Sequence, residues 1–513
     1  MKRVLSIILV FALATAVLAG CGNNSSGSGP GGLDTSKAAE LIVYNFGEPH
    51  LDAQVVVDAL NVKLKEDINA TFSWNWIPWT DYQQTYSLLL AAGEPIDITY
   101  TATWTPFLDH AQRGAFLALN DLLPVNAPDI YALFTEMDWL ECSWEGNIYA
   151  IPSYYPMVLP NGVVYRDDLR QKYNLSPINS MATLEAYLQA VADNEPDLIP
   201  YHAATTLDVN PIDFFWLEYS FAEATTATNT FIAYPASPGQ EHMRDIFNYI
   251  ESPEFEQFCI KMRDWYERGF WSRNVLTNNV TAMDAMVNGR SAMAIAHVER
   301  LIGDVANPMR VDHPEWEPTA WLFSDNMGYV FRAATMQDAT AIPRTSSNPE
   351  RALAALNLLM TDQAYFDLGF YGIEGVHHVF NDDGSVSRAP GVDPQNEAYG
   401  VHGLNQWNMR NRNIIREFFD PDPWVEGVEM KERSFGYSIG NKLNAFQFNL
   451  ESIEAELAAI AQLDAQYRVP LLWGAADIST LEEYRQQLRN AGSEKVMEEL
   501  KRQITEFADA HGY

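Results

Sequence analysis

Several aromatic side chains stand where short apolar runs end and a strand is expected to stop. Phe46 closes the run LIVYNF, Trp79 closes ATFSWNWIPW, and Trp104 follows shortly after IDITY. Flat apolar ring faces suit the C–H faces of sugar rings, and a carboxylate such as that of Glu48 suits sugar hydroxyl groups. These residue types therefore predict a carbohydrate-binding surface with Phe46, Glu48, Trp79 and Trp104 as candidate contacts.

Other interpretations of the same aromatic residues stay open. Trp74 and Trp76 alternate with polar Ser73 and Asn75, so we expect both to pack in the core. Trp79 and Trp104 fit the wall of a cleft and fit the core or general surface equally well.

The motifs of common enzyme classes give no candidate catalytic residue, metal site or cofactor site. GYSIG, residues 436–440, matches G-x-S-x-G, but the charged stretch MKERSF before it is not the apolar strand that a nucleophile elbow follows. We expect a loop or turn around Ser438. His377 and His378 are adjacent, so a strand would send them to opposite faces and not to one metal ion. In FNDDGS the Asp-Gly pair favours a hairpin turn over a calcium loop, which would need a distal Glu.

An alternation of strands and helices positions the aromatic residues. The strand 41–46 is followed by a helix around Val56, Leu60 and Leu64, by a strand over 70–76, by a helix that ends at Gly93, and by a strand over 96–100. This order predicts a doubly wound α/β sheet, in which the crevice lies beyond the carboxyl ends of the strands. Phe46, Trp79 and Trp104 would then share one edge.

The C-terminal part of the chain predicts helices. Apolar residues recur at spacings of three and four, which gives one apolar stripe on each helix. They are Leu450, Ile453, Leu457, Ile460 and Leu463, and then Val496, Leu500, Ile504 and Phe507. Thr480 and Glu483 have the spacing of a capping box at the start of a helix between these two sets.

The first 36 residues indicate secretion and anchoring. Lys2 and Arg3 precede an apolar run of roughly 15 residues, shorter than the ~20 that span a bilayer, so residues 1–20 form a predicted signal peptide. LAGC at its end resembles the lipobox of bacterial lipoproteins. That resemblance implies that Cys21 carries a thioether-linked diacylglycerol and becomes the mature N-terminus. The Gly- and Ser-rich residues that follow, within 21–36, predict a flexible tether.

The charge and cysteine content exclude some classes of partner. The net charge is −35, and a surface this acidic is repelled by nucleic acid and by anionic membranes, so we expect no nucleic-acid partner and membrane contact only through the lipid anchor. Besides Cys21 the chain has two cysteines, Cys142 and Cys259, which we expect to be buried thiols, with a disulfide as the alternative.

Several motifs, taken in order, resemble the extracellular solute-binding proteins of ABC transporters, in the class similar to maltose-binding protein. These motifs are AAGEPIDI (91–98), GAFLALNDLL (114–123), GNIYAIP (146–152), VVYRDDL (163–169), NGRSAMAI (288–295) and IPRTSSNPERALAALNLLMTDQ (342–363). The C-terminal region, which includes YGIEGVHH (371–378) and GNKLNAFQFNL (440–450), resembles the DUF3502 extension of a Gram-positive lipoprotein branch of that family.

The resemblance implies a two-lobed fold of the periplasmic-binding-protein type II kind, each lobe a doubly wound sheet flanked by helices, with a helical C-terminal region. The first lobe would comprise residues 37–152 plus 336–372, and the second 153–335 plus 373–513. Passages between the lobes are expected near 151–155, 335–343 and 369–375. Tyr154, Tyr155 and Glu374 lie at these passages and join the candidate ligand contacts.

The function implied by the resemblance is that of a monomeric lipid-anchored receptor, not an enzyme. It would capture a carbohydrate, and more specifically an oligosaccharide, and deliver it to the permease subunits of an ABC importer on the outer face of a Gram-positive cell membrane. Three alternatives remain: a receptor of the same fold for peptides or other polar solutes, a secreted polysaccharide hydrolase, and an adhesion or sensor lipoprotein.

Overall fold

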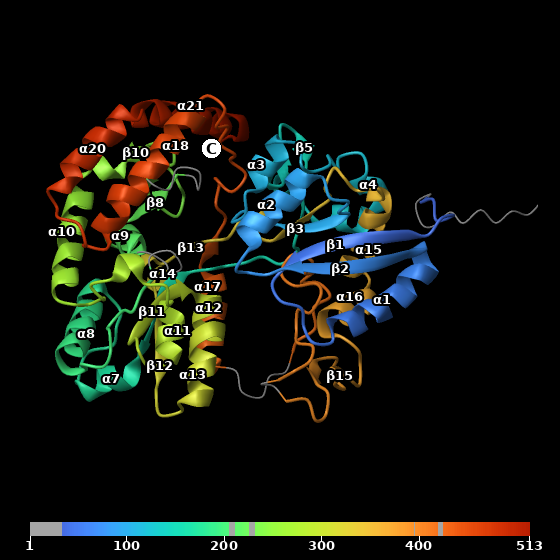
Figure 1. Ribbon diagram of the computed structural model, residues 1–513, viewed down its shortest axis with the longest axis horizontal. Coiled ribbons are helices and arrows are strands. Elements are labelled where there is room, and N and C mark those ends of the chain that lie inside the picture. The colour runs from blue at the N-terminus through green and yellow to red at the C-terminus, as the bar shows by residue number, and fades with distance from the viewer. Residues whose placement is uncertain (1–32, 205–210, 225–230, 394–395, 419–423) are drawn as a thin grey trace, which may run out of the picture.

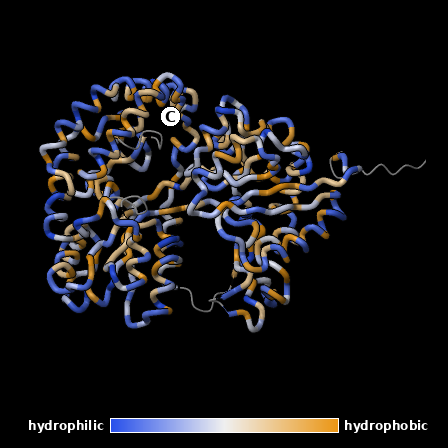
Figure 2. The backbone as a smooth tube through the Cα atoms, viewed as in Figure 1, coloured by the Kyte–Doolittle hydropathy of each residue, from blue (hydrophilic) through white to orange (hydrophobic). Residues whose placement is uncertain are grey.

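In the computed structural model, which describes residues 33–204, 211–224, 231–393, 396–418 and 424–513, the chain forms two lobes side by side (Figure 1). The predicted signal peptide, Cys21 and most of the predicted tether lie outside the described residues. Each lobe contains β-sheet flanked by helices, which confirms the two-lobed α/β fold. Hydrophobic stretches run through the interior of both lobes (Figure 2).

The first lobe is built on a five-stranded sheet with the order β2-β1-β3-β14-β6. The strand β1 (Ala39–Phe46) pairs in parallel with β2 (Ala70–Ile77) and β3 (Ile98–Thr101). The strand β14 (Ala339–Ala341) pairs antiparallel with β3 and with β6 (Ile151–Pro152). Because parallel strands end at one edge, the segments that follow β1, β2 and β3 meet there.

Alternate side chains of these strands pack under different helices. Leu41 and Val43 of β1 belong to the core that contains the buried apolar residues of α1 (Ala53–Ile68) and α15 (Pro349–Thr361) and Tyr365 of α16 (Gln363–Tyr371). Phe46 belongs to a second core, on the other face of the sheet, with α2 (Tyr82–Ala92) and α3 (Phe107–Gln112). The period of two in the sequence thus gives a sheet buried on both faces. The smaller elements of this lobe are α4 (Leu123–Asn126), α5 (Pro128–Leu133), α6 (Glu136–Glu141), β4 (Ser143–Trp144) and β5 (Asn147–Ile148).

The second lobe has two three-stranded sheets. In one, β7 (Asn161–Arg166) lies between β11 (Met293–His297) and β12 (Pro318–Leu322), and both pairings are antiparallel, whereas the sequence had predicted a doubly wound sheet in each lobe. The other has the order β10-β9-β8, with β8 at Phe221–Glu223, β9 at Ile232–Pro235 and β10 at Phe247–Asn248. The helices around them are α7 (Asp167–Lys172), α8 (Met181–Asn194), α9 (Ile212–Tyr219), α10 (Pro253–Glu267), α11 (Ala282–Val287), α12 (Val298–Arg300), α13 (Asn307–Asp312), α14 (Phe323–Met327) and α17 (Val425–Gly436).

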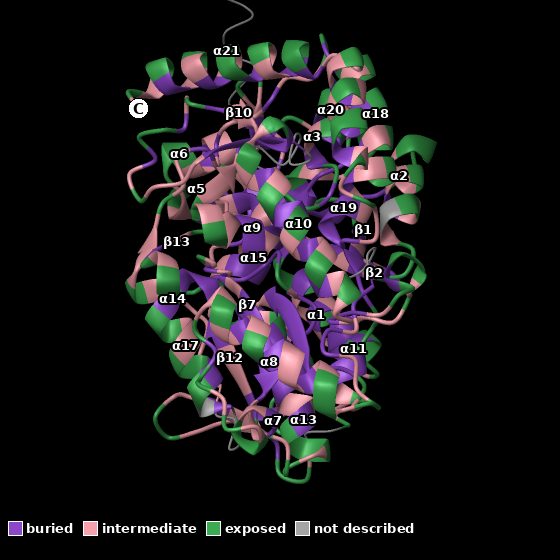
Figure 3. Cartoon of the chain, turned by 90° about the vertical axis from the view of Figure 1, so that its left-hand side faces the viewer, coloured by how far each residue is buried: buried purple, intermediate pink, exposed green. Residues whose placement is uncertain are grey.

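The C-terminal helices complete the core of the second lobe. They are α18 (Glu454–Leu463), α19 (Val469–Leu472), α20 (Thr480–Asn490) and α21 (Ser493–His511). In Figure 3 the helix α21 lies along one edge of the molecule with its buried residues toward the lobe and its exposed residues outward. Trp271 donates a hydrogen bond from Nε1 to the Trp473 carbonyl over 2.8 Å, which ties this region to α10 and its following loop. The predicted capping box is wrong, because Ser479 is the N-cap residue and the Thr480 hydroxyl donates to the Asp477 carbonyl instead.

Residues 153–160 and 331–338 connect the two lobes. The first segment joins β6 to β7, and the second joins β13 (Val330–Phe331) to β14. Residues 440–450, which lead from β17 (Ser438–Ile439) to the C-terminal helices of the second lobe, also contact the first lobe, since Gln447 Nε2 donates to the Glu141 carbonyl over 3.4 Å.

The expected boundary at residue 372 differs from the observed packing. Tyr399, Leu404 and Met409 belong to the same core as α1 and α15, so residues 373–393 and 396–418 pack on the first lobe. The chain reaches the second lobe at Trp424, which is buried and precedes α17. The chain therefore does not leave the first lobe near 369–375 as expected, because apolar contacts and amide hydrogen bonds hold the residues that follow to this lobe.

GYSIG and the pair His377 and His378, the motifs considered for catalysis and metal binding, have structural roles. Gly436 ends α17, and Ser438, in a two-residue strand and not a loop, donates its hydroxyl to the Phe435 carbonyl over 2.9 Å. His377 contacts Asp52 over 3.1 Å, whereas the neighbouring His378 contacts the Tyr371 carbonyl over 3.1 Å.

The Asp-Gly pair forms the hairpin turn that the sequence predicted. It connects β15 (His378–Phe380) to β16 (Val386–Arg388), and the Asp383 carboxylate accepts a hydrogen bond from the Ser385 backbone N–H over 2.9 Å. Cys142 and Cys259 are both buried free thiols. Within the described part of the chain, every helix is too short or too polar to span a bilayer.

Loss of a buried contact on α21 tests whether this helix is part of the second-lobe core. Leu500 is fully buried, so Leu500→Ala is expected to lower the free energy of unfolding by about 2–5 kcal/mol through lost apolar burial and a residual cavity. Urea unfolding measures this change. The matched control is Leu51→Ala, where the leucine is 86% exposed and the expected change is small. Equal stability of the two variants would contradict the packing of α21.

Candidate functional site

An exposed group of three tryptophans lies at the carboxyl edge of the first-lobe sheet. Trp79, which follows β2, is 40% exposed, and Trp104, which follows β3, is 37% exposed; their ring centroids lie 6.1 Å apart. Trp407, from the segment after α16, is 39% exposed and its ring centroid is 5.5 Å from that of Trp79. We call these three residues the tryptophan wall.

Phe46 supports this wall from below. Its side chain is fully buried, and its ring contacts those of Trp79, Trp104 and Tyr82 at centroid distances of 6.1, 6.0 and 5.3 Å. The structure thus places Phe46 behind the surface, whereas the sequence had suggested a direct contact. Gly47, with φ of 103°, lets the chain turn beneath Trp79, because a Cβ there would lie 3.0 Å from Trp79 Nε1.

A buried carboxyl group fixes the orientation of Trp104. Asp338 is 5% exposed and accepts hydrogen bonds from the Tyr100 hydroxyl and, over 3.4 Å, from Trp104 Nε1. Arg410 Nη2 lies 3.5 Å from the same carboxyl group, and its guanidinium stacks over the Tyr155 ring at 4.3 Å. Burial raises the pKa of Asp338 from its ordinary value, although the contacts with Tyr100, Arg410 and Trp104 oppose the shift.

A cavity of about 910 Å³ lies between the lobes and is lined by both of them. Trp104 and Glu141 line it from the first lobe, and Trp216 lines it from α9 of the second lobe. The connecting segment 331–337 and residues 441–450 contribute further apolar and amide side chains. Trp104 therefore belongs both to the tryptophan wall and to this cavity, which we call the interlobe cavity.

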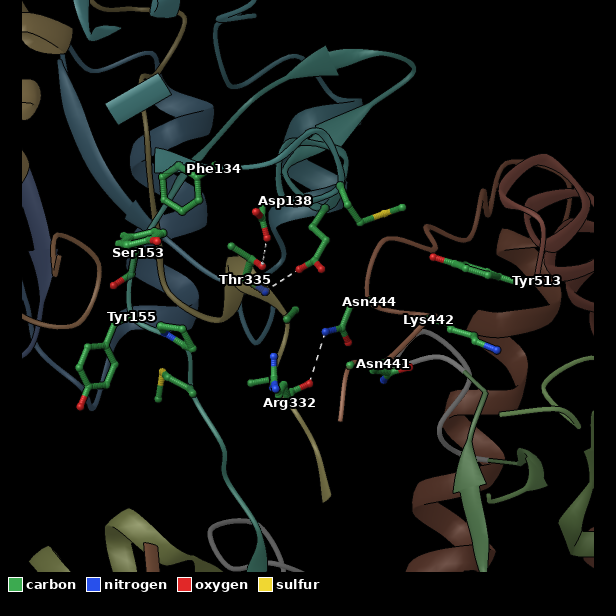
Figure 4. A pocket seen from close by; sticks show the side chains of 18 residues that line it. Phe134, Asp138, Ser153, Tyr155, Arg332, Thr335, Asn441, Lys442, Asn444 and Tyr513 are labelled. Carbon is green, nitrogen blue, oxygen red and sulfur yellow. Dashed lines mark hydrogen bonds between the residues drawn. The ribbon is translucent and has the colours of Figure 1, made fainter. Parts of the chain in front are cut away.

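A smaller cavity of about 390 Å³ adjoins it at the connecting segments (Figure 4). Tyr154, Tyr155 and Arg332 line this second cavity, whereas Glu141 and Asn444 line both. In Figure 4 Thr335 points to Asp138 and to Glu141, and Asn444 points to the Arg332 carbonyl. These hydrogen bonds join the segment 331–338 to α6 and to the segment 440–450. Tyr154 also packs against Phe134 at a ring-centroid distance of 5.4 Å.

Of the residues predicted as ligand contacts, Phe46, Glu48, Trp79 and Glu374 line neither cavity. Glu48 and Glu374 are exposed. Glu374 belongs to the tight turn before β15, where it forms a bridge with His378. The structure therefore places Trp104, Tyr154 and Tyr155 in the cavity linings and Trp79 beside Trp104 in the tryptophan wall, and it leaves Glu48 and Glu374 apart from both.

Three carboxyl groups of the interlobe cavity have raised pKa values. Burial raises the pKa of Glu141, Asp213 and Glu223 to about 7 each. Asn161 Nδ2 donates to Asp213 Oδ2 over 2.9 Å, and the Thr335 backbone N–H donates to Glu141. Such groups exchange between donor and acceptor roles near neutral pH, and both roles suit hydroxyl-bearing ligands.

The lining of the interlobe cavity fits a binding site for a polar ligand. Over the described ranges no cluster of three or more His, Cys, Asp or Glu side chains is arranged to hold a metal ion. The cavity offers instead aromatic faces beside amide and carboxyl groups, which is the composition of a site for a polar ligand with apolar faces.

Sequence reasoning missed several residues of this region. Trp407 and Arg410 come from the polar stretch NQWNMRNRN, and Asn441, Asn444 and Gln447 come from GNKLNAFQFNL. Neither stretch has helical or strand periodicity. The density of amide side chains in both stretches was the one feature of the sequence that could have indicated a binding role. Trp216 lies in the apolar helix FFWLEY, where nothing in the pattern separates it from the core.

Known proteins resemble this chain in sequence and in fold. Residues 59–368 match the family described as bacterial extracellular solute-binding protein, and residues 442–509 match DUF3502, a domain of unknown function. A carbohydrate ABC transporter substrate-binding protein of Streptococcus pneumoniae serotype 4 is 23% identical over 515 residues, which cover 97% of this chain and 96% of that relative. The resemblance predicted from the sequence motifs is confirmed.

Solved structures share the fold at low sequence identity. The N-glycan transport solute binding protein NgtS of Streptococcus pneumoniae has a TM-score of 0.73 at 19% identity, covering 92% of this chain and 99% of its own. Its complex with Man5GlcNAc has a TM-score of 0.67 with the same identity and coverage. A human-milk-oligosaccharide (HMO) binding protein of Bifidobacterium longum infantis has a TM-score of 0.65 at 14% identity, covering 92% and 99%.

The raised pKa of Asp213 predicts a pH-dependent effect on stability. A carboxyl group whose folded pKa lies above its unfolded value near 3.8 destabilises the fold increasingly as the pH rises toward about 7. Asp213→Asn removes the cost of ionising this buried group. The stability of the variant relative to the wild type is therefore expected to increase from pH 5 to pH 8, by an amount on the order of 1 kcal/mol or more. Urea unfolding at the two pH values measures the gain. The control is exposed Asp382→Asn, and a difference for Asp213→Asn that stays constant with pH would contradict the assignment.

Proposed function

We propose that this chain, which belongs to the family of bacterial extracellular solute-binding proteins, captures an oligosaccharide between its lobes and delivers it to the transmembrane subunits of an ABC importer. The observation that carries the proposal is the tryptophan wall beside a cavity lined by both lobes. Family membership supports solute binding, and the composition of the cavity supports a sugar as the solute.

The wall and the cavity match the two sides of a sugar ring. Trp79, Trp104 and Trp407 offer flat faces for C–H groups, and the side chains of Asn161, Asn441 and Gln447 offer donors and acceptors for hydroxyl groups. The cavity volume of about 910 Å³ lies at the upper end of the range of about 300–1,000 Å³ for small-molecule sites, which favours a ligand of several rings.

Similar proteins support the same ligand class. The relative from Streptococcus pneumoniae is named as a carbohydrate ABC transporter substrate-binding protein, and two of the similar structures are named for N-glycan transport and for binding of human milk oligosaccharides. One of these structures holds Man5GlcNAc. We carry over the chemical class alone, an oligosaccharide, to this chain.

Capture requires the lobes to close. A ligand that contacts the wall of the first lobe and the polar groups of the second binds the closed form more tightly, and it shifts the population toward that form by the difference in affinity. The segments 153–160 and 331–338, which join the two lobes, are the places where we expect the chain to bend. The closed receptor then presents one combined surface to the permease.

The N-terminus supports an anchored monomer on the outer face of the cell membrane. Two or three acyl chains on Cys21 hold a protein stably on a bilayer, where a single chain does not. Anchoring keeps the receptor at high effective concentration beside its transporter. In a Gram-positive cell, which has no outer membrane to confine a free receptor, this anchor prevents loss by diffusion.

Binding without turnover is the first test of the function. Isothermal titration calorimetry with a panel of oligosaccharides is expected to find a ligand, and small-angle scattering is expected to show compaction when it binds. Trp104→Ala is expected to weaken binding at least tenfold because one stacking face is lost. The matched control is Trp316→Ala, which should leave affinity unchanged because Trp316 packs on Arg166 and does not line the interlobe cavity.

The same samples separate a receptor from a hydrolase. Carboxyl groups of Glu141 on one lobe and Asp213 on the other line the cavity, and a glycoside hydrolase needs two carboxyl groups flanking its substrate. Recovery of the ligand intact after long incubation supports the receptor. Cleavage of the ligand by the wild type, lost in Glu141→Gln or Asp213→Asn, would contradict the receptor function and support a hydrolase.

The anchor has a test of its own. In a Gram-positive host the wild-type protein is expected in the membrane fraction, and Cys21→Ala is expected to lose the diacylglycerol and to leave the membrane fraction. Cys142→Ala, which changes a buried thiol in the first lobe, is the control and should stay with the membrane. Membrane retention of Cys21→Ala would contradict lipidation at this residue.

A further inference from the structure

The interlobe cavity has an uneven distribution of charged groups. Among its described lining residues there are four carboxyl groups and no Lys, Arg or His. The carboxyl groups are those of Asp109 and Glu141 on the first lobe and of Asp213 and Glu223 on the second. A ligand enclosed in this cavity is therefore surrounded by acidic groups on both walls.

Only one of the four carboxyl groups has a cationic partner of its own. Asp109 pairs with Arg113 over 2.7 Å at the exposed rim. Among the ion pairs of the described residues, none involves Glu141, Asp213 or Glu223. When these three carboxyl groups are ionised, no directly bound cation therefore neutralises their negative charge.

Three cations around this region bind other partners. Arg468, which acts on Glu223 from a distance, is buried and bound to Asp464. Arg332 and Lys442 line the smaller cavity, where Arg332 Nε donates to Ser438 Oγ over 3.2 Å and Lys442 Nζ donates to the Gly239 carbonyl over 2.7 Å. An anionic group in the interlobe cavity would thus meet carboxyl groups without an available cation.

Enclosure makes this arrangement selective. Water screens charges weakly inside a closed cavity, so like charges repel there more strongly than they do at the surface. Burial raises the pKa of Glu141, Asp213 and Glu223 to about 7, so above that pH they are mainly ionised, and repulsion of an anionic ligand is then fully present.

We propose that the interlobe cavity selects its sugar by charge, accepting uncharged or amine-bearing residues and rejecting residues that carry a carboxylate or sulfate group. Glu141, Asp213 and Glu223 are the specificity-determining residues. This inference rests on the proposed function, since it names the class of oligosaccharide that the receptor takes.

A matched pair of ligands isolates the effect of charge. The probes are a neutral oligosaccharide that binds in the calorimetric panel, its derivative with every primary hydroxyl oxidised to a carboxylate, and the carboxamide made from that derivative. The carboxylate and the carboxamide have nearly the same shape, so they differ chiefly in charge. At pH 8 the carboxamide is expected to bind at least tenfold more tightly than the carboxylate.

Variants connect that difference to the named residues. The double variant Asp213→Asn, Glu223→Gln is expected to reduce the ratio between carboxamide and carboxylate affinities at least threefold, and Glu141→Gln gives a second measurement from the other lobe. Asp109→Asn, which changes the carboxyl group already paired with Arg113, is the control and should change the ratio least. Circular dichroism checks that each variant is folded.

The possible outcomes separate this inference from the proposed function. Equal or tighter binding of the carboxylate, or a ratio unchanged in all the variants, overturns the charge selection and leaves the oligosaccharide receptor standing. If only acidic oligosaccharides bind, the charge selection is likewise overturned and the oligosaccharide receptor stands. Failure of neutral, amine-bearing and acidic oligosaccharides alike overturns the receptor, and the charge selection with it.

Discussion

The buried carboxyl group of Asp338 is the constraint on which the binding region depends. A carboxyl group 5% exposed is costly unless its oxygens are satisfied, and its partners come from three separate parts of the first lobe. Tyr100 belongs to β3, Trp104 to the segment after it, and Arg410 to the segment that packs beside α16. The Asp338 carboxyl group thus holds together β3, Trp104 of the tryptophan wall and the segment after α16 that supplies Trp407.

The same residue links the wall to the connection between the lobes. Asp338 directly precedes β14, and its carbonyl accepts a hydrogen bond from the Ser153 backbone N–H over 2.9 Å, where the first connecting segment begins. Through Arg410 it also positions the ring of Tyr155 within that segment. The two neighbouring connections are therefore held to the first-lobe sheet where they begin and end, at Ser153 and Asp338.

The sequence was sufficient where local pattern determines structure. The alternation in β1 and β2 and the end of each strand predicted the sheet and its carboxyl edge, and this placed Trp79 and Trp104 together. It was insufficient where long-range packing decides. The segment that carries Trp407 has no period, and it is held by contacts such as Asn408 Nδ2 to Thr340 Oγ1 over 2.9 Å and Asn411 Nδ2 to the Met360 carbonyl over 2.7 Å. The third passage between lobes was misplaced for the same reason, and Phe46 was taken as a contact because strand-end position does not reveal burial.

The two walls of the cleft make different contributions to binding. The first-lobe wall is preorganised, since Phe46 supports Trp79 and Trp104 from below and Asp338 fixes Trp104, so stacking costs little ordering of side chains. The second lobe brings Asp213, Glu223 and amide groups that reach the ligand only when the lobes approach. Apolar stacking is tolerant of sugar identity, whereas buried polar groups discriminate strongly because a mismatched ligand leaves them unpaired. Under the proposed function, selectivity therefore arises mainly at closure, so a sugar that stacks on the wall without satisfying the second lobe occupies the receptor without closing it.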